Sequence, residues 1–68
     1  MRNYETYINN VKCSVSMSGG DEADYDSAES IIHDSDNAPI EKIAGIVHSE
    51  ITRDWHDANG FMISIEAV

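Results

Sequence analysis

Basic residues are scarce in this sequence, and none lies between Lys12 and Lys42. Four Lys and Arg stand against thirteen Asp and Glu, which gives the 68-residue chain a formal net charge of −9. Binding to nucleic acid or to an anionic membrane surface depends on Lys and Arg, so we expect neither. The charge favours a basic protein as the partner, because an acidic field steers such a protein into contact.

Cysteine and long apolar runs are also nearly absent. Cys13 is the single cysteine, whereas secreted domains of this size usually carry several disulfides. No apolar run approaches the length that spans a membrane, and the first seven residues lack the apolar core of a signal peptide. We therefore expect a soluble protein of the cytoplasm.

Motifs for catalysis or for metal binding are missing as well. His33, Asp34 and Asp36 are close in sequence. An EF-hand loop starting at Asp34 would need Gly and Glu at its sixth and twelfth positions, where Pro39 and Gly45 stand. No HExxH sequence occurs. We expect no enzyme activity, no metal site and no cofactor, and a small metal or redox enzyme ranks last among the alternatives.

Residues 3–18 have the pattern of a β-hairpin. Side chains alternate on both sides of Asn9-Asn10, and Asn tolerates the positive φ that two-residue hairpin turns need. Such a turn places six residues on one face of the hairpin: Tyr4, Thr6, Ile8, Val11, Cys13 and Val15. The opposite face then carries Glu5, Tyr7, Lys12 and Ser14.

Two helices are predicted after the hairpin. Asp21 has the character of an N-cap for a helix over roughly 22–33. Pro39 suits the first turn of a second helix, which we expect to run from Pro39 to about Ala58 and to end at Asn59-Gly60. The apolar faces of the two helices consist of Ala28, Ile31 and Ile32, with Tyr25 at the margin, and of Ile40, Ile43, Ala44, Val47, Ile51 and Trp55.

A last strand is predicted by the alternation of Phe61, Ile63 and Ile65 with polar or exposed neighbours. The order ββααβ indicates an α+β fold in one domain over residues 1–68. A three-stranded antiparallel sheet with two helices on one face is the simplest arrangement, because one sheet face and two helix faces then bury each other. The predicted core contains Val15, Ile43, Val47, Ile51, Trp55 and Ile63.

The acidic residues are concentrated in the first helix and just after it. Glu22, Asp26 and Glu29 form like-charge pairs three or four residues apart, each costing a few tenths of a kcal/mol, and no Lys or Arg close in sequence relieves them. A merely solvated face would mix both signs. The pattern therefore predicts a surface that binds a basic partner, made of Asp21, Glu22, Asp24, Asp26, Glu29, Asp34 and Asp36.

The second helix has a feature that predicts a secondary interface. Gly45 lies inside the helix, where Gly costs about 1 kcal/mol relative to Ala. Together with Ile46 and Ser49 it points away from the apolar face. This strip, or an uncovered sheet edge, supports the alternative of a small structural or regulatory module that forms a homodimer.

In its overall character the chain resembles the small acidic inhibitors encoded by phages and mobile elements, of which anti-CRISPR proteins are the best-known group. The features shared are size, the net charge of −9, the carboxylates from Asp21 to Asp36 and the lack of an enzyme motif. The resemblance implies a protein in the host cytoplasm that inhibits an effector complex, either by occupying its nucleic-acid-binding surface or by blocking its assembly. Carboxylates one helical turn apart, about 5–6 Å, would then act as a DNA mimic on the effector's phosphate-binding groove.

Overall fold

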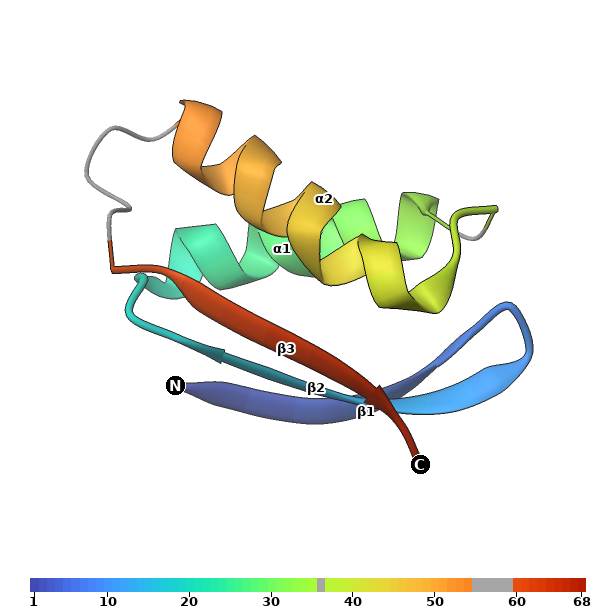
Figure 1. Cartoon of the computed structure of the whole chain (residues 1–68). Helices are drawn as coiled ribbons and strands as arrows, with labels where there is room; N and C mark the ends of the chain where they lie inside the picture. Colours follow the sequence, from blue (N-terminus) through green and yellow to red (C-terminus); the bar gives the residue numbers. More distant parts are fainter. Residues whose placement is uncertain (36, 55–59) are drawn as a thin grey trace.

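The computed structural model describes residues 1–35, 37–54 and 60–68. These residues form β1 (Arg2–Ile8), β2 (Val11–Ser18), α1 (Glu22–Asp34), α2 (Ile40–Asp54) and β3 (Met62–Ala67). The strands make one antiparallel sheet in the order β1-β2-β3, and both helices cover the same face of it (Figure 1). The predicted α+β fold and its element order are confirmed.

The β1–β2 hairpin turns at Asn9-Asn10. Both residues have positive φ, 53° and 67°, as a type I′ turn requires, and the twist of that turn matches the twist of the strands. The predicted register is confirmed: Ile8 lies opposite Val11, Thr6 opposite Cys13, and Tyr4 opposite Val15. The turn chemistry and the alternation therefore specify this part of the fold locally.

The core lies between the sheet and the two helices. Its buried members are Ile8, Cys13, Val15, Met17, Tyr25, Ala28, Ile32, Ile43, Val47, Ile51 and Phe61. Of the predicted core, Val15, Ile43, Val47 and Ile51 are buried, whereas Ile63 is half-buried because β3 is an edge strand. Trp55 lies outside the described residues.

Phe61 and Tyr25 are more central than the sequence indicated. Phe61 is fully buried, with its ring centroid 6.3 Å from that of Tyr25 on α1 and 6.2 Å from that of His48 on α2. Tyr25, expected at the margin, is 2% exposed, and its hydroxyl accepts a hydrogen bond from the Gly20 N–H at 3.2 Å. These aromatic contacts join both helices to the start of β3.

The helix boundaries differ slightly from those expected. α1 ends at Asp34, one residue later than predicted, and α2 begins at Ile40, directly after Pro39. The last described residue of α2 is Asp54. The predicted continuation to Ala58 and the Asn59 part of its cap fall outside the described residues. No helix in the described ranges is long and apolar enough to cross a membrane.

A close backbone approach joins the end of β2 to the start of β3. Gly19 has φ +79°, and a Cβ there would lie 1.8 Å from the carbonyl oxygen of Gly60. Only glycine accepts that conformation and that contact without a shift of the backbone. Gly19 thus allows the chain to leave β2, pass Gly60 and enter α1 directly above the sheet.

The face of the sheet turned away from the helices is mostly polar but also carries exposed Met62 and Tyr7. Its cross-strand rows include Glu5, Ser14 and Glu66, and Asn3, Ser16 and Ser64. Glu5 and Lys12 approach within 3.7 Å. The predicted outward position of Tyr7 is confirmed, with 69% of the residue exposed.

Candidate functional site on the acidic face of helix α1

The N-terminus of α1 is fixed by a reciprocal capping box. The Asp21 side chain accepts a hydrogen bond from the Asp24 N–H at 2.9 Å, and the Asp24 side chain accepts one from the Asp21 N–H at 3.1 Å. Asp24 is only 8% exposed. Two of the seven predicted partner-binding acids therefore satisfy backbone donors at the start of the helix.

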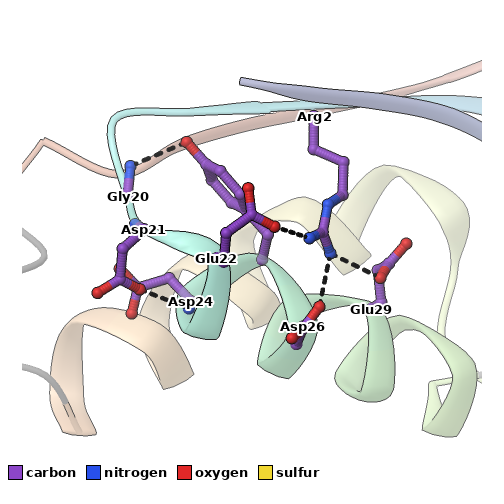
Figure 2. Close-up of polar contacts among 8 residues, drawn as sticks. Arg2, Gly20, Asp21, Glu22, Asp24, Asp26 and Glu29 are labelled. Carbon is purple, nitrogen blue, oxygen red and sulfur yellow. Dashed lines mark hydrogen bonds and ion pairs between the residues drawn. The ribbon is translucent and has the colours of Figure 1, made fainter.

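Three other predicted acids converge on one cation. The guanidinium of Arg2, on β1, contacts Glu22, lies 2.9 Å from Asp26 Oδ1 and lies 2.8 Å from Glu29 Oε2 (Figure 2). Its central carbon is 5.5 Å from the Tyr25 ring centroid, within the range of a cation–π contact. The structure thus brings Glu22, Asp26 and Glu29 together around a guanidinium.

No basic residue close in sequence relieves these carboxylates, but Arg2, which is distant in sequence, does so in the folded chain. Arg2 has the same strand phase as Tyr4, Thr6 and Ile8, so its side chain points to the helix layer. The antiparallel hairpin returns the chain to the level of Arg2 before α1 begins. The alternation of β1 already indicated that Arg2 faces the helices. Its contact with the α1 carboxylates could not be predicted from local pairs, because these residues are 20–27 positions apart.

The pKa values of Arg2 and Tyr4, which lie beside this flank, are both raised by their surroundings. Hydrogen bonding to Asp26 is the largest effect and raises the pKa of Arg2 above its ordinary value; burial opposes this rise, and Glu22 and Glu29 add to it. Burial, followed by the charge of Glu29, raises the pKa of Tyr4 to about 12, although Arg2 acts in the opposite direction. Arg2 therefore stays charged and Tyr4 stays neutral at physiological pH.

The carboxylates remain open to solvent despite the contact with Arg2. The side chains of Glu22, Asp26 and Glu29 are 82%, 71% and 39% exposed. Asp34, 84% exposed, lies 3.6 Å from the His33 ring. With His33 neutral, these four carboxylates against the single guanidinium of Arg2 leave three negative charges on this flank of α1. Asp36, the seventh predicted acid, lies outside the described residues.

A groove separates the acidic flank of α1 from β1. It has a volume of about 310 Å³ and is lined by Tyr4, Thr6, Tyr7, Glu29, Ile32 and His33. A second hollow of about 410 Å³ lies along the helix and is lined by Asp26, Glu29, Ser30, His33 and Asp34. Both are lined by Glu29 and His33, so the two hollows are neighbours, with apolar and hydroxyl groups beside β1 and carboxylates beside α1.

The predicted secondary interface lies on the solvent side of α2. Gly45 is exposed, and a Cβ built on it would meet nothing within 4 Å. Ile46 is 39% exposed and Ser49 is also exposed. The packing of the described chain therefore does not require glycine at position 45.

Neither the cysteine nor a cluster of ligands forms a reactive centre in the described part of the chain. Cys13 is fully buried in the core with its thiol 3.5 Å from the Val11 carbonyl oxygen. The described residues contain no group of three or more His, Cys, Asp or Glu placed to hold a metal ion. What the acidic flank does show is the ability to hold a guanidinium group.

The acidic face of α1 is therefore the candidate site, and its members have different positions. Asp21 and Asp24 cap the helix, whereas Glu22, Asp26 and Glu29 surround Arg2. Comparisons with protein-family models, curated proteins and solved structures found no significant match.

Proposed function

We propose that this chain is a non-enzymatic binding protein whose acidic α1 face contacts a basic surface of another protein. The observation that carries the proposal is the Arg2 contact, in which Asp26 and Glu29 lie within 2.9 Å of one guanidinium. Guanidinium groups bind carboxylates through directed, charge-assisted hydrogen bonds. Arg or Lys side chains of a partner would meet the same carboxylates from the solvent side.

The charge that remains after the Arg2 contact supports this proposal. Surface ion pairs contribute little to stability, and one guanidinium does not neutralise Glu22, Asp26, Glu29 and Asp34. The surplus is concentrated on one flank, where it repels other acids and attracts a basic surface over about one Debye length, about 8 Å in physiological salt. A partner would therefore be recognised both at a distance and in contact.

The partner class we propose is a nucleic-acid-binding protein, with a CRISPR effector complex as one such target. Glu22, Asp26 and Glu29 follow one another at about one helical turn, about 5.4 Å. That spacing allows several carboxylates to occupy neighbouring phosphate sites on a basic groove. The chain would then act as an inhibitor by excluding the effector's nucleic acid.

Affinity capture with matched charge variants tests the proposal. The triple variant Glu22→Gln, Asp26→Asn, Glu29→Gln removes three charges from the α1 flank. The control variant Glu5→Gln, Glu41→Gln, Glu66→Gln removes three charges from the open sheet face and from the start of α2. Each immobilised variant is exposed to a nuclease-treated host lysate, and retained proteins are identified by mass spectrometry after folding is verified by amide spectra.

We expect the original chain and the control variant to retain the same nucleic-acid-binding protein, and the α1 variant to lose it. The retained protein should dissociate as salt rises, and nucleic acid should compete with the chain for it. Equal retention by both triple variants would contradict the proposed function. The two variants have the same net charge and differ only in whether the three charges were removed from α1 or from elsewhere.

Homodimerisation through α2 is the alternative function. It is favoured by the exposed Ile46 next to Gly45, where a Cβ would meet nothing within 4 Å. Sedimentation equilibrium should show a dimer that the double variant Gly45→Arg, Ile46→Asp converts to a monomer. A monomer at all concentrations tested would remove this alternative.

A further inference from the structure

The outer edge of β1 is uncovered in the described ranges. β1 is one of the two edge strands of the sheet, and among the described residues it pairs only with β2. An edge strand presents backbone N–H and C=O groups that another strand is able to pair with. β1 carries no Pro and no Lys. Its inward-pointing charge, Arg2, is paired with carboxylates of α1, and its other charge, Glu5, lies within 3.7 Å of Lys12.

The hydrogen bonds of the sheet identify the backbone groups that face outward. The Lys12 carbonyl accepts a hydrogen bond from the Val68 N–H at 2.9 Å, so Lys12 presents its backbone to β3. Lys12 lies opposite Tyr7, and this pair is therefore not hydrogen-bonded between β1 and β2. Because such pairs alternate along an antiparallel ladder, Asn3, Glu5 and Tyr7 direct their N–H and C=O groups away from β2.

Side chains of a strand added at this edge would alternate between two different environments. Those on the side of Tyr4 and Thr6 would enter the groove of about 310 Å³ between β1 and α1. That groove is lined by Glu29, which also lines the neighbouring hollow together with Asp26 and Asp34. The other side chains would extend the polar open face beside Asn3, Glu5 and Tyr7.

Arg2 already shows how such a side chain binds. It stands on the helix-facing side of β1, and its guanidinium reaches Glu22, Asp26 and Glu29 on α1 (Figure 2). A basic residue on a neighbouring strand would approach the same carboxylates from the solvent side, where Glu22 and Asp26 are mostly exposed. Alternate residues of a strand are about 6.8 Å apart, close to the helical pitch of about 5.4 Å that separates these carboxylates.

We propose that the partner of the acidic face is an extended basic segment that adds to β1 as an antiparallel fourth strand. Its Lys or Arg residues occupy every second position and face α1, and this inference rests on the proposed function. A second copy of this chain does not fit the same edge, because pairing β1 with β1 would bring two acidic flanks of two −9 chains together. Main-chain pairing supplies affinity, and the α1 carboxylates supply selection for basic side chains.

Synthetic peptides test this mode of binding without altering the protein. The probe is Lys-Thr-Lys-Thr-Lys-Thr-Lys, which matches the seven residues of β1. In antiparallel addition its Thr residues lie opposite Asn3, Glu5 and Tyr7, so the Thr N–H groups face β1 and the Lys N–H groups face solvent. The first control peptide carries N-methyl groups on the Thr amides, which removes the N–H groups that face β1. The second control peptide carries them on the Lys amides, which removes only N–H groups that face solvent. Both keep the full charge.

We expect the unmodified and Lys-methylated peptides to bind in low salt, and the Thr-methylated peptide to bind more weakly. Each lost main-chain hydrogen bond should reduce affinity by about threefold to tenfold. Hydrogen exchange of the Asn3, Glu5 and Tyr7 amides should slow on binding, since these donors become paired. Binding is measured by titration while amide spectra are recorded.

Single substitutions at the two sheet edges provide the protein-side control. Glu5→Pro removes an N–H that is not used within the sheet and should weaken peptide binding, whereas Glu5→Gln keeps that N–H and should retain it. Ala67→Pro makes the equivalent change at the outer edge of β3 and should leave peptide binding unchanged. Thermal melts verify that each variant is folded.

The outcomes separate this inference from the proposed function. If both methylated peptides bind equally and the Asn3, Glu5 and Tyr7 amides are not protected, strand addition is wrong. If, in addition, the Glu22→Gln, Asp26→Asn, Glu29→Gln variant does not bind these peptides, the acidic face remains a binding site for basic side chains without strand addition. If no peptide binds even in low salt, strand addition is contradicted, whereas the proposed function is still decided by the capture experiment with the two triple variants.

Discussion

The two flanks of the helical layer are held to the sheet in different ways. On the β3 side, α2 contributes Ile43, Val47 and Ile51, each at most 1% exposed. On the β1 side, α1 contributes Glu22, Asp26 and Glu29 to the ion pairs with Arg2, and the exposed fractions of these carboxylates reach 82%. The α2 side is stabilised mainly by buried apolar area, whereas the α1 side also contains a solvent-exposed cluster of charges.

The two sides therefore differ in how much they contribute to the stability of the fold. Buried apolar side chains contribute about 1.5–3 kcal/mol each, whereas exposed ion pairs contribute about 0–1 kcal/mol. The apolar flank of α2 is therefore constrained by folding. The acidic flank of α1 retains the freedom to bind a partner, because exchanging Arg2 contacts for partner contacts costs the fold little.

The largest effect is expected in the apolar flank. Ile43→Ala removes a fully buried side chain of α2 and leaves a cavity, so it should destabilise the protein by about 2–5 kcal/mol. Urea unfolding measures the change. The conservative variant Ile43→Val should lose only about 0.5–1.5 kcal/mol. A small effect of Ile43→Ala would mean that α2 does not hold the core as described.

A smaller loss is expected at the N-terminus of α1. Asp21→Ala removes the acceptor for the Asp24 N–H, and loss of such an N-cap costs about 0.5–2 kcal/mol. Asp21→Asn keeps a side-chain acceptor and should preserve most of the stability. Thermal unfolding of the two variants compares them directly. If both are equally destabilised, the charge of Asp21 rather than its hydrogen bond stabilises the helix.

A gain in stability is expected on the solvent side of α2. Gly45→Ala should stabilise the protein by up to about 1 kcal/mol, because a Cβ there meets open space and Ala is the better helix former. Urea unfolding at low protein concentration measures this. Loss of stability, or loss of a dimer in sedimentation, would show that glycine is needed for an interface at this position.

A salt-dependent loss is expected from the charged flank. Arg2→Gln leaves Glu22, Asp26 and Glu29 without their common cation, so the melting temperature should fall in low salt. The difference from the original chain should shrink at about 1 M salt, where the Debye length is about 3 Å. Arg53→Gln, which affects a local i,i+3 pair with Glu50, provides the matched control. A loss that does not change with salt would indicate packing of the Arg2 side chain as the cause.

The smallest effect concerns the phenol beside Glu29. Burial, then Glu29, raises the pKa of Tyr4 from 10.0 to about 12. A raised pKa means that the folded state holds the proton more tightly than the unfolded state. The resulting stability is fully present below pH 10 and is lost as the pH rises through about 12. Absorbance of ionised tyrosine, compared with a Tyr4→Phe variant, measures this; ionisation of Tyr4 near pH 10 would contradict its half-buried position.

Much of the fold was determined by local sequence. Asn9-Asn10 and the alternation on either side specify the hairpin and its register, because a shift of one residue would turn every side chain to the other face. Asp21 and Asp24 define the start of α1 through their mutual hydrogen bonds. Pro39 precedes α2, and the spacing of Ile43, Val47 and Ile51 defines its buried face.

The tertiary structure decided what the acidic residues contact. The sequence shows a row of carboxylates on one helix with no Lys or Arg close in sequence, because spacing along a helix reveals only the neighbours on that helix. Arg2 is brought to that row only by the antiparallel return of β2 and by the position of α1 over the sheet. The same return leaves Asn3, Glu5 and Tyr7 facing outward next to the acidic groove. Sequence periodicity assigns each side chain a face, but the distance between faces depends on how the layers pack.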